Sequence, residues 1–235
     1  MNRNLQRWPI ARGYRIFPRV IPGPISHMSL GLVLGLRHAF EADHIAAVAT
    51  IVSRERSPVR AGFIGGFWGL GHLASLLLVG LPVIGLGLKF PEQLNLPLEL
   101  GVAAMIVFLG VGSLTRDRFP ARHAHSHSLR DLGKRPFWVG AAHGLAGSGS
   151  LTLVILATMP SRTDGLFYLG LFGAGSIAGM MAASVILSVP VAASGLAGPA
   201  ATRRLGQAAA FASVIFGLFY GATTIALALA GHPLS

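Results

Sequence analysis

The stretch LRHAFEADHIA, residues 36–46, places charged and titratable side chains in the middle of an apolar segment. These side chains are Arg37, His38, Glu41, Asp43 and His44. The sequence reads MSLGLVLG before them and IAAVATIV after them, as apolar as a membrane-spanning helix. A charged side chain at the centre of a bilayer costs roughly 2.5–3.5 kcal/mol on insertion scales. Pairing that only holds a helix bundle together could explain one such residue, but five within eight positions predict a functional site.

The angular spacing of these side chains indicates an irregular helix. Taking His38 as the origin, a rotation of about 100° per residue places Arg37, Glu41 and His44 at about 260°, 300° and 240°. Asp43 falls at about 140°, on the other side of the helix. An unbroken α-helix therefore cannot aim His38, Asp43 and His44 at one small ion. The stretch predicts either a break in the helix or a site that uses two of its sides, and broken helices are common at transporter substrate sites.

The charge and chemistry of the stretch suit a divalent cation. Arg37 contributes +1, Glu41 and Asp43 contribute −1 each, and neutral histidines contribute nothing, so the net charge is −1. Imidazole with carboxylate is a ligand set for nickel, cobalt, zinc or copper(II). The chain contains no cysteine, which excludes thiolate sites. His72 and His143, each beside a glycine in another apolar stretch, are the candidates to complete the site.

The composition of the chain indicates an integral membrane protein. Of the 235 residues, 52% are hydrophobic and 11% are charged, and the mean hydropathy is +0.63, whereas about a quarter of the residues of a typical soluble domain are charged. The formal net charge of +11 would suggest nucleic acid for a soluble protein. Here the basic residues lie between apolar stretches, so we expect the lipid bilayer as their partner and no nucleic acid.

The hydropathy pattern predicts an all-α membrane protein with about six transmembrane helices, because a hydrocarbon core of about 30 Å needs roughly 17–25 residues of helix. We expect them near residues 28–52, 61–86, 98–114, 137–159, 165–190 and 206–230. The whole chain, 1–235, would form one polytopic domain. Its predicted parts are a basic N-terminal tail (1–27), a three-helix repeat (28–114), a polar loop with histidines (115–136) and a second three-helix repeat (137–230).

A weak internal similarity predicts that the two halves form an inverted repeat. GLRHAFEADHIA (35–46) aligns with GAAHGLAGSGSL (140–151), so that His38 corresponds to His143. Similarly, GLGHLASL (69–76) aligns with GAGSIAGM (173–180), where Ser176 takes the place of His72. Two units of three helices each must have opposite topologies, because three is odd. Inverted repeats are a transporter architecture, with the substrate site near the midplane of the bilayer.

A second group of histidines lies in the predicted polar loop. The sequence HAHSH places His123, His125 and His127 at alternating positions. Histidine-rich tracts bind metals loosely, although three histidines in a solvated loop can also have no role. We treat them as candidates for metal capture, secondary to the site within the membrane.

The motif around Asp43 resembles a known family. RHAFEADHIAAV (37–48) is similar to the signature of the nickel/cobalt transporter family, a histidine, four residues and then Asp-His in an early span. LGH (70–72) resembles the start of the second motif of that family, although Leu73 and Ala74 follow it here. The later acidic motif of the family, Asp-Thr-Ala-Thr-Glu, is absent. HGLAGSGSL (143–151) instead resembles the smaller branch of urease-accessory-like membrane permeases.

The resemblance implies nickel or cobalt transport across a bacterial cytoplasmic membrane, often to supply urease or hydrogenase maturation. We therefore expect a multi-pass permease that transports Ni²⁺ or Co²⁺ in preference to Zn²⁺. We do not expect the protein to be an enzyme or to hold a prosthetic group. His38, Asp43 and His44 would bind the ion, and His72 and His143 would complete its shell. Arg37 and Glu41 would support the site by adjusting the local charge or pairing with each other. The sequence leaves import and efflux open.

Two other classes of protein fit the residues less well. An intramembrane metallohydrolase would use a glutamate between histidines, but the H-E-x-x-H motif is absent. A haem protein would face pairs of histidines across helices, and the carboxylates beside His44 would be unfavourable near haem. No G-x-x-x-x-G-K-[ST] motif occurs in the chain, so any dependence on ATP would need a partner.

Overall fold

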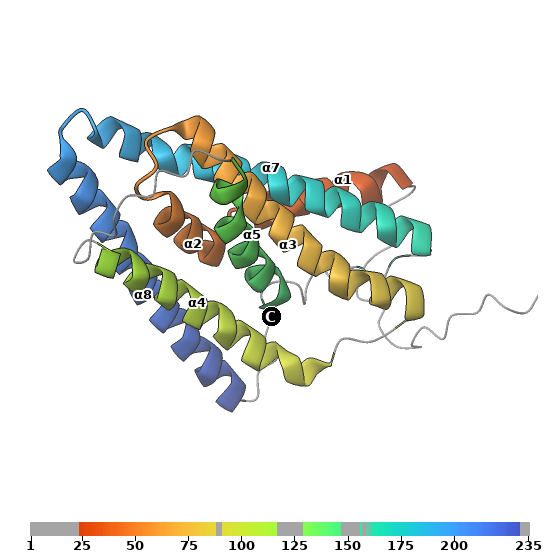
Figure 1. Ribbon diagram of the computed structural model, residues 1–235. Helices are drawn as coiled ribbons and strands as arrows, with labels where there is room; N and C mark the ends of the chain where they lie inside the picture. The colour runs from red at the N-terminus through yellow and green to blue at the C-terminus, as the bar shows by residue number, and fades with distance from the viewer. Residues whose placement is uncertain are drawn as a thin grey trace, which may run out of the picture.

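The computed structural model describes residues 24–87, 91–116, 129–146, 156, 159 and 161–230. This part of the chain forms helices joined by short connections and contains no strand (Figure 1). Its helices are α1 (Pro24–His38), α2 (Ala42–Val52), α3 (Pro58–Leu86), the 3₁₀-helix η1 (Glu92–Leu94), α4 (Asn95–Arg116), α5 (Leu129–Ala146), α7 (Arg162–Ser194) and α8 (Pro199–Leu229). The predicted all-α class is confirmed. The loop histidines His123, His125 and His127 lie outside the described residues.

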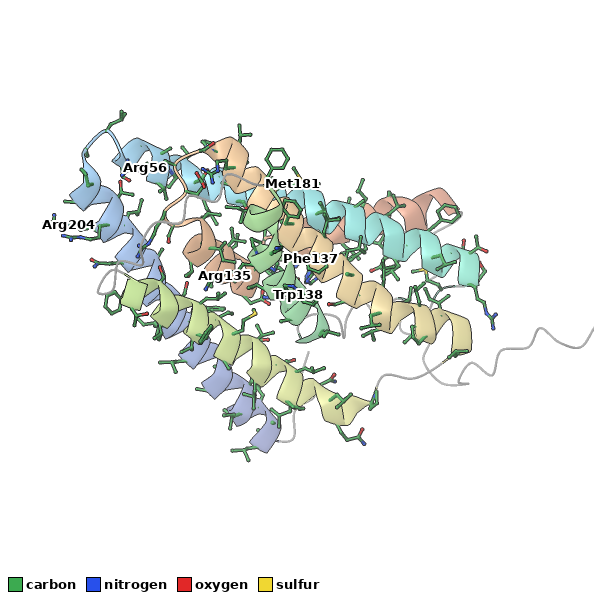
Figure 2. The ribbon with its side chains drawn as sticks, viewed as in Figure 1. Arg56, Arg135, Phe137, Trp138, Met181 and Arg204 are labelled. Atoms are coloured by element: carbon green, nitrogen blue, oxygen red, sulfur yellow. The ribbon has the colours of Figure 1, made fainter. Side chains whose placement is uncertain are left out.

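Four of the described helices are long and apolar enough to cross a membrane. They are α3, α4, α7 and α8, and α2 is a shorter apolar helix. Large apolar side chains on their outer surfaces are strongly exposed, among them Phe108 (71%) and Leu78 (68%). Figure 2 shows such side chains projecting from the helices along the length of the molecule, with Arg56 and Arg204 at one end. Apolar outer faces of this kind suit contact with lipid.

The predicted span 28–52 is two helices. α1 ends at His38, and Phe40 and Glu41 each donate a backbone hydrogen bond to the carbonyl three residues earlier, which tightens the end of the helix. Glu41 then adopts an extended conformation with φ −64° and ψ 152°, and α2 begins at Ala42. A break was one of the two arrangements that the angular spacing predicted. The described residues form seven α-helices, so the predicted count of six transmembrane helices is not confirmed, and α1 and α2 overlap a single predicted span.

The fourth predicted span also begins at a different place. α5 starts at Leu129, within the predicted polar loop 115–136, and its described residues end at Ala146. Pro136 lies inside this helix. Hydropathy locates where a segment becomes apolar, but a helix can extend beyond that point with polar residues, as LRDLGKR does here.

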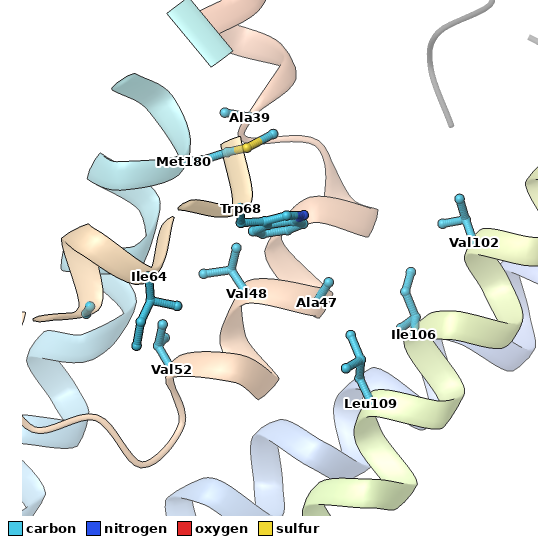
Figure 3. Close-up of a cluster of buried hydrophobic side chains, with 11 residues drawn as sticks. Ala39, Ala47, Val48, Val52, Ile64, Trp68, Val102, Ile106, Leu109 and Met180 are labelled. Carbon is cyan, nitrogen blue, oxygen red and sulfur yellow. The ribbon is translucent and has the colours of Figure 1, made fainter. Parts of the chain in front are cut away.

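The helices pack in two groups that α2 connects. α1 packs against α7, α3 packs against both α5 and α7, and α4 packs against α8. Figure 1 shows α4 and α8 lying side by side, with α2 between this pair and the other helices. A buried apolar cluster joins the groups: Ala47 of α2 lies toward Ile106 of α4, and Val48 of α2 lies beside Trp68 of α3 (Figure 3).

Glycines bring α1 close to α7. Gly31 lies against the backbone of Tyr168, and Gly35, one turn later, lies against the carbonyl of Phe172, so the two helices run parallel. A β-carbon at position 35 would overlap that carbonyl. Small residues allow such close approach of membrane helices.

The contact between α5 and α3 matches the contact between α1 and α7. Gly140 lies against the carbonyl of Trp68 and Gly144 against that of His72, so these helices also run parallel. In the repeat alignment Gly140 corresponds to Gly35. Trp68 corresponds to Phe172, because Trp68 lies four residues before His72 and Phe172 lies four residues before Ser176, the residue aligned with His72.

The α4–α8 pair has the same kind of internal match. A β-carbon on Gly110 would lie 2.8 Å from the carbonyl oxygen of Ala210, and one on Gly217 would lie 2.9 Å from that of Ala103. Gly110 lies seven residues after Ala103, and Gly217 lies seven residues after Ala210. The two contacts are therefore reciprocal, and the two helices run antiparallel.

Hydroxyl groups join α2 to α8. The hydroxyls of Thr50 and Ser213 are 2.5 Å apart, and Ser213 Oγ donates to the carbonyl of Ala46 at 2.8 Å. Both side chains are buried. Hydrogen bonds between membrane helices contribute about 0.6 kcal/mol on average and up to about 1.7 kcal/mol.

We therefore expect Ser213→Ala to lower the stability of the folded protein by about 0.5–1.5 kcal/mol. Thermal unfolding in detergent measures this loss. Thr223→Ala on the same helix is the control, because Thr223 is only partly buried and its hydroxyl bonds to the backbone of its own helix. Equal stability of the two variants would contradict the prediction.

Candidate metal centre

The break between α1 and α2 brings four histidines together. His38 ends α1, His44 lies in the first turn of α2, His72 is in the middle of α3 and His143 is near the end of α5. All four are buried, with relative exposures of 0–4%. Asp43 joins them with a side chain that is 12% exposed. The structure thus brings together all five residues that the sequence proposed as ligands.

The potential ligand atoms form two overlapping groups. Within each group the ligand atoms lie within 4.8 Å of one another. One group is made by His38, His44 and His72, and the other by Asp43, His44 and His143. His44 belongs to both. The first group joins α1, α2 and α3, and the second joins α2 and α5.

Asp43 uses its two carboxylate oxygens on two histidines. Oδ1 accepts a hydrogen bond from the backbone N–H of His44 at 2.8 Å and lies 3.0 Å from Nδ1 of the same residue. Oδ2 lies 2.9 Å from Nε2 of His143. The carboxylate that an unbroken helix would have turned away is therefore at the centre of the site.

Glu41 lies behind His38. Its Oε2 is 3.0 Å from Nδ1 of His38, and Nε2 of His38 is 3.2 Å from Nε2 of His72. A carboxylate on one ring nitrogen orients a histidine and makes the other nitrogen a better metal ligand. Glu41 therefore contacts a candidate ligand, while Arg37, the other residue expected to support the site, is exposed.

Several buried ring nitrogens of the site have no hydrogen-bond partner among the described residues. They are Nε2 of His44, Nδ1 of His72 and Nδ1 of His143. Buried polar atoms are usually satisfied, so unpaired imidazole nitrogens here are available to an additional ligand. Four imidazoles and one carboxylate form a nitrogen-rich donor set that suits first-row transition metals.

Two aromatic rings that sequence reasoning missed enclose the histidines. Trp68 stacks on His44 with ring centroids 5.6 Å apart and meets His143 edge-on at 5.6 Å. The ring centroid of Phe172 lies 5.3 Å from that of His38. Both rings are buried. The repeat alignment could have revealed them, because they occupy corresponding positions in the two halves.

Ser176 marks a chemical difference between the two aligned sequence segments. It occupies the position that corresponds to His72, but its hydroxyl donates to the carbonyl of Gly35 at 3.2 Å. Ser176 belongs to neither group of ligand atoms. The site therefore draws its histidines from α1, α2, α3 and α5 but none from α7.

A comparison with curated proteins identifies the family of this chain. It is 31% identical over 213 residues to the urease accessory protein UreH of Bacillus sp. (strain TB-90), an alignment that covers 83% of this chain and 90% of UreH. The chain belongs to the UreH branch of the nickel/cobalt transporter family. This result confirms the resemblance drawn from residues 37–48 and 143–151.

A cobalt transport protein matches the chain over a shorter stretch. The cobalt transport protein NhlF of Rhodococcus rhodochrous is 39% identical over 79 residues, which is 32% of this chain and 21% of NhlF. No family model and no solved structure matches the chain. The apolar helices and these relatives together identify a multi-pass membrane protein.

Proposed function

We propose that this protein is a permease for Ni²⁺, or for Co²⁺, in a bacterial cytoplasmic membrane. The ion would bind between the α1–α2 break, α3 and α5, on His38, Asp43, His44, His72 and His143. The observation that carries the proposal is the convergence of four buried histidines and a carboxylate inside an apolar helix bundle. Transport is favoured over catalysis because the relatives have transport or accessory names.

The electrostatics of the site support a divalent cation. Asp43 and Glu41 supply two negative charges within hydrogen-bond distance of the histidines, and the nearest cationic residue in sequence, Arg37, is exposed. Neutral imidazoles bind a transition metal without adding charge. A transported ion must also be released, so the site should bind with moderate strength.

The packing of the helices supports the inverted repeat. In a six-span arrangement the first and fifth spans are parallel, as are the second and fourth, and α1 runs parallel to α7 as α5 does to α3. The break in the first span would be the discontinuous helix on which transporters build substrate sites. The α1–α2 unit, α3 and α4 would form one half, and α5, α7 and α8 would belong to the other.

The name of the longer-matching relative supports a supply role. A urease accessory protein in this family is consistent with nickel uptake for the maturation of a metalloenzyme. Efflux by the same site is the alternative direction. Accumulation of nickel, cobalt, zinc and manganese in cells with and without the protein identifies both the ion and the direction.

Replacing His38 or His44 with alanine tests the site. We expect each variant to lose nickel uptake by at least about 100-fold while it still inserts, because removing only a supporting partner of a metal ligand already costs about 10–100-fold. Uptake of radioactive nickel by intact cells is the measurement. His232→Ala is the matched control, since His232 lies outside the predicted spans.

Size-exclusion chromatography in detergent checks that each variant is folded. Normal uptake by both folded variants would overturn the site, whereas loss of uptake in His232→Ala as well would show that the assay reports expression rather than binding.

A further inference from the structure

We propose that the site offers the ion two alternative positions that share His44. The first position is made by His38, His44 and His72, and the second by Asp43, His44 and His143. This inference rests on the proposed function, and it divides the five candidate ligands into two sets that act in succession.

The geometry of His44 supports two positions. Its Nδ1 lies 3.0 Å from Asp43 Oδ1, on the side of the second group. Its Nε2 is buried and has no hydrogen-bond partner among the described residues. The ring centroid of His44 is 4.4 Å from that of His38 and 4.2 Å from that of His143, so His44 lies between the two groups. Each ring nitrogen can therefore serve a different position.

The chemistry of imidazole makes the two positions mutually exclusive. A neutral imidazole has one nitrogen with a lone pair and one with a proton. An ion on Nε2 of His44 leaves Nδ1 as the N–H that donates to Asp43, whereas an ion on Nδ1 leaves the proton on Nε2. One chain would consequently hold one ion at a time, and the ion would move from one position to the other.

The carboxylates are distributed so that the ion stays close to a negative charge when it moves between the two positions. The second position includes the carboxylate of Asp43 directly, and the first has Glu41 behind His38 at 3.0 Å. Each position therefore has one carboxylate within reach of the ion or of its ligand. The donor sets differ, with three nitrogens in the first position and two nitrogens and an oxygen in the second.

The two positions predict that binding needs one group and transport needs both. In a nanodisc, the His72→Ala variant should keep the second position intact, and the His143→Ala variant should keep the first position intact. Each variant should still bind one Ni²⁺ per chain with less than about a tenfold loss of affinity, whereas transport in proteoliposomes should fall by at least about 100-fold. The double variant should lose binding. Equilibrium dialysis with radioactive nickel measures the binding.

X-ray absorption of the bound Ni²⁺ identifies which position remains. His143→Ala should show three imidazole ligands, and His72→Ala should show two imidazoles with a carboxylate oxygen. Ser176→Ala is the control, because Ser176 corresponds to His72 in the repeat but lies in neither group, and it should bind and transport nickel normally. If an alanine variant does not fold, His72→Asn or His143→Asn fills more of the vacated space.

A single shared position would give a different result. Each single variant would then lose affinity as fully as the double variant, and this pattern would overturn the inference while nickel binding and transport by the unaltered protein still support the proposed function. Absence of nickel and cobalt binding and transport in the unaltered protein would overturn the proposed function, and the two-position inference with it.

Discussion

Replacing Asp43 with asparagine is expected to lower nickel transport by about 100-fold, which corresponds to about 3 kcal/mol, the upper end of what a hydrogen bond to a charged group contributes. Asparagine keeps the shape of the side chain but removes its charge. It also places an amide NH₂, which only donates, where one oxygen now faces a histidine nitrogen. Because the carboxylate contacts both His44 and His143, the substitution disturbs α2 and α5 together.

Two matched substitutions separate this effect from a general loss of charge. Glu41→Gln should reduce transport by only about tenfold, because Glu41 contacts His38 from behind and its side chain is 42% exposed. Asp164→Asn should leave transport unchanged, since Asp164 lies in the first turn of α7 and bonds to Ser161. Initial rates of nickel uptake into proteoliposomes provide the comparison. Equal losses for Asp43→Asn and Asp164→Asn would contradict the assigned role of Asp43.

The residues of the site could be proposed from the sequence because ionisable groups are rare inside membrane helices. His38, Asp43 and His44 stand out against apolar neighbours, and the fixed rotation per residue in a helix showed that they could not converge without a break or a second face. His72 and His143 were found because they are isolated histidines beside glycines in apolar stretches, aided by the repeat. The structure brings all five together.

The internal organisation of the site could not be predicted in the same way. The conformation of the three residues between α1 and α2 determines that Glu41 contacts His38 and that the ligands divide into two groups. Trp68 and Phe172 carry no signal of their own, because aromatic residues are common in apolar helices. Their contacts with the histidines depend on how α3 and α7 are rotated against the other helices.

The fold was predictable to the level of apolar segments. Hydropathy located the spans that became α3, α4, α7 and α8, since lipid-facing and core-facing residues are both apolar. It did not predict the restart at Ala42 or the start of α5 at Leu129. A helix boundary depends on backbone hydrogen bonds and capping, which vary independently of hydropathy.

Gly35→Ala is expected to have the second large effect, on stability as well as transport. The added β-carbon would overlap the backbone carbonyl of Phe172, which cannot move aside as a side chain can. Overpacking of this kind costs about 1–3 kcal/mol and sometimes more. Separating α1 from α7 also displaces His38, which lies three residues later, and a shift of about 1 Å at a reacting group can cost roughly 100-fold in rate.

The same substitution at Gly140 should have a similar effect, because its β-carbon would overlap the carbonyl of Trp68 and His143 again lies three residues later. Gly170→Ala and Gly101→Ala are the controls, since no atom lies within 4 Å of a β-carbon at either position. Alanine favours a helix over glycine by up to about 1 kcal/mol, so the controls should be unchanged or slightly stabilised. Thermal unfolding and nickel transport measured on all four variants give the test.

The pattern across these glycines bears on both the packing and the repeat. Large losses of stability and transport in the Gly35 and Gly140 variants, with no loss in the controls, would follow from close helix contacts at matching positions of the two halves. A stable, active Gly35→Ala variant would contradict the close approach of α1 to α7. Loss at only one of the two glycines would contradict the match between the halves, because equivalent contacts should respond equally to the same added carbon.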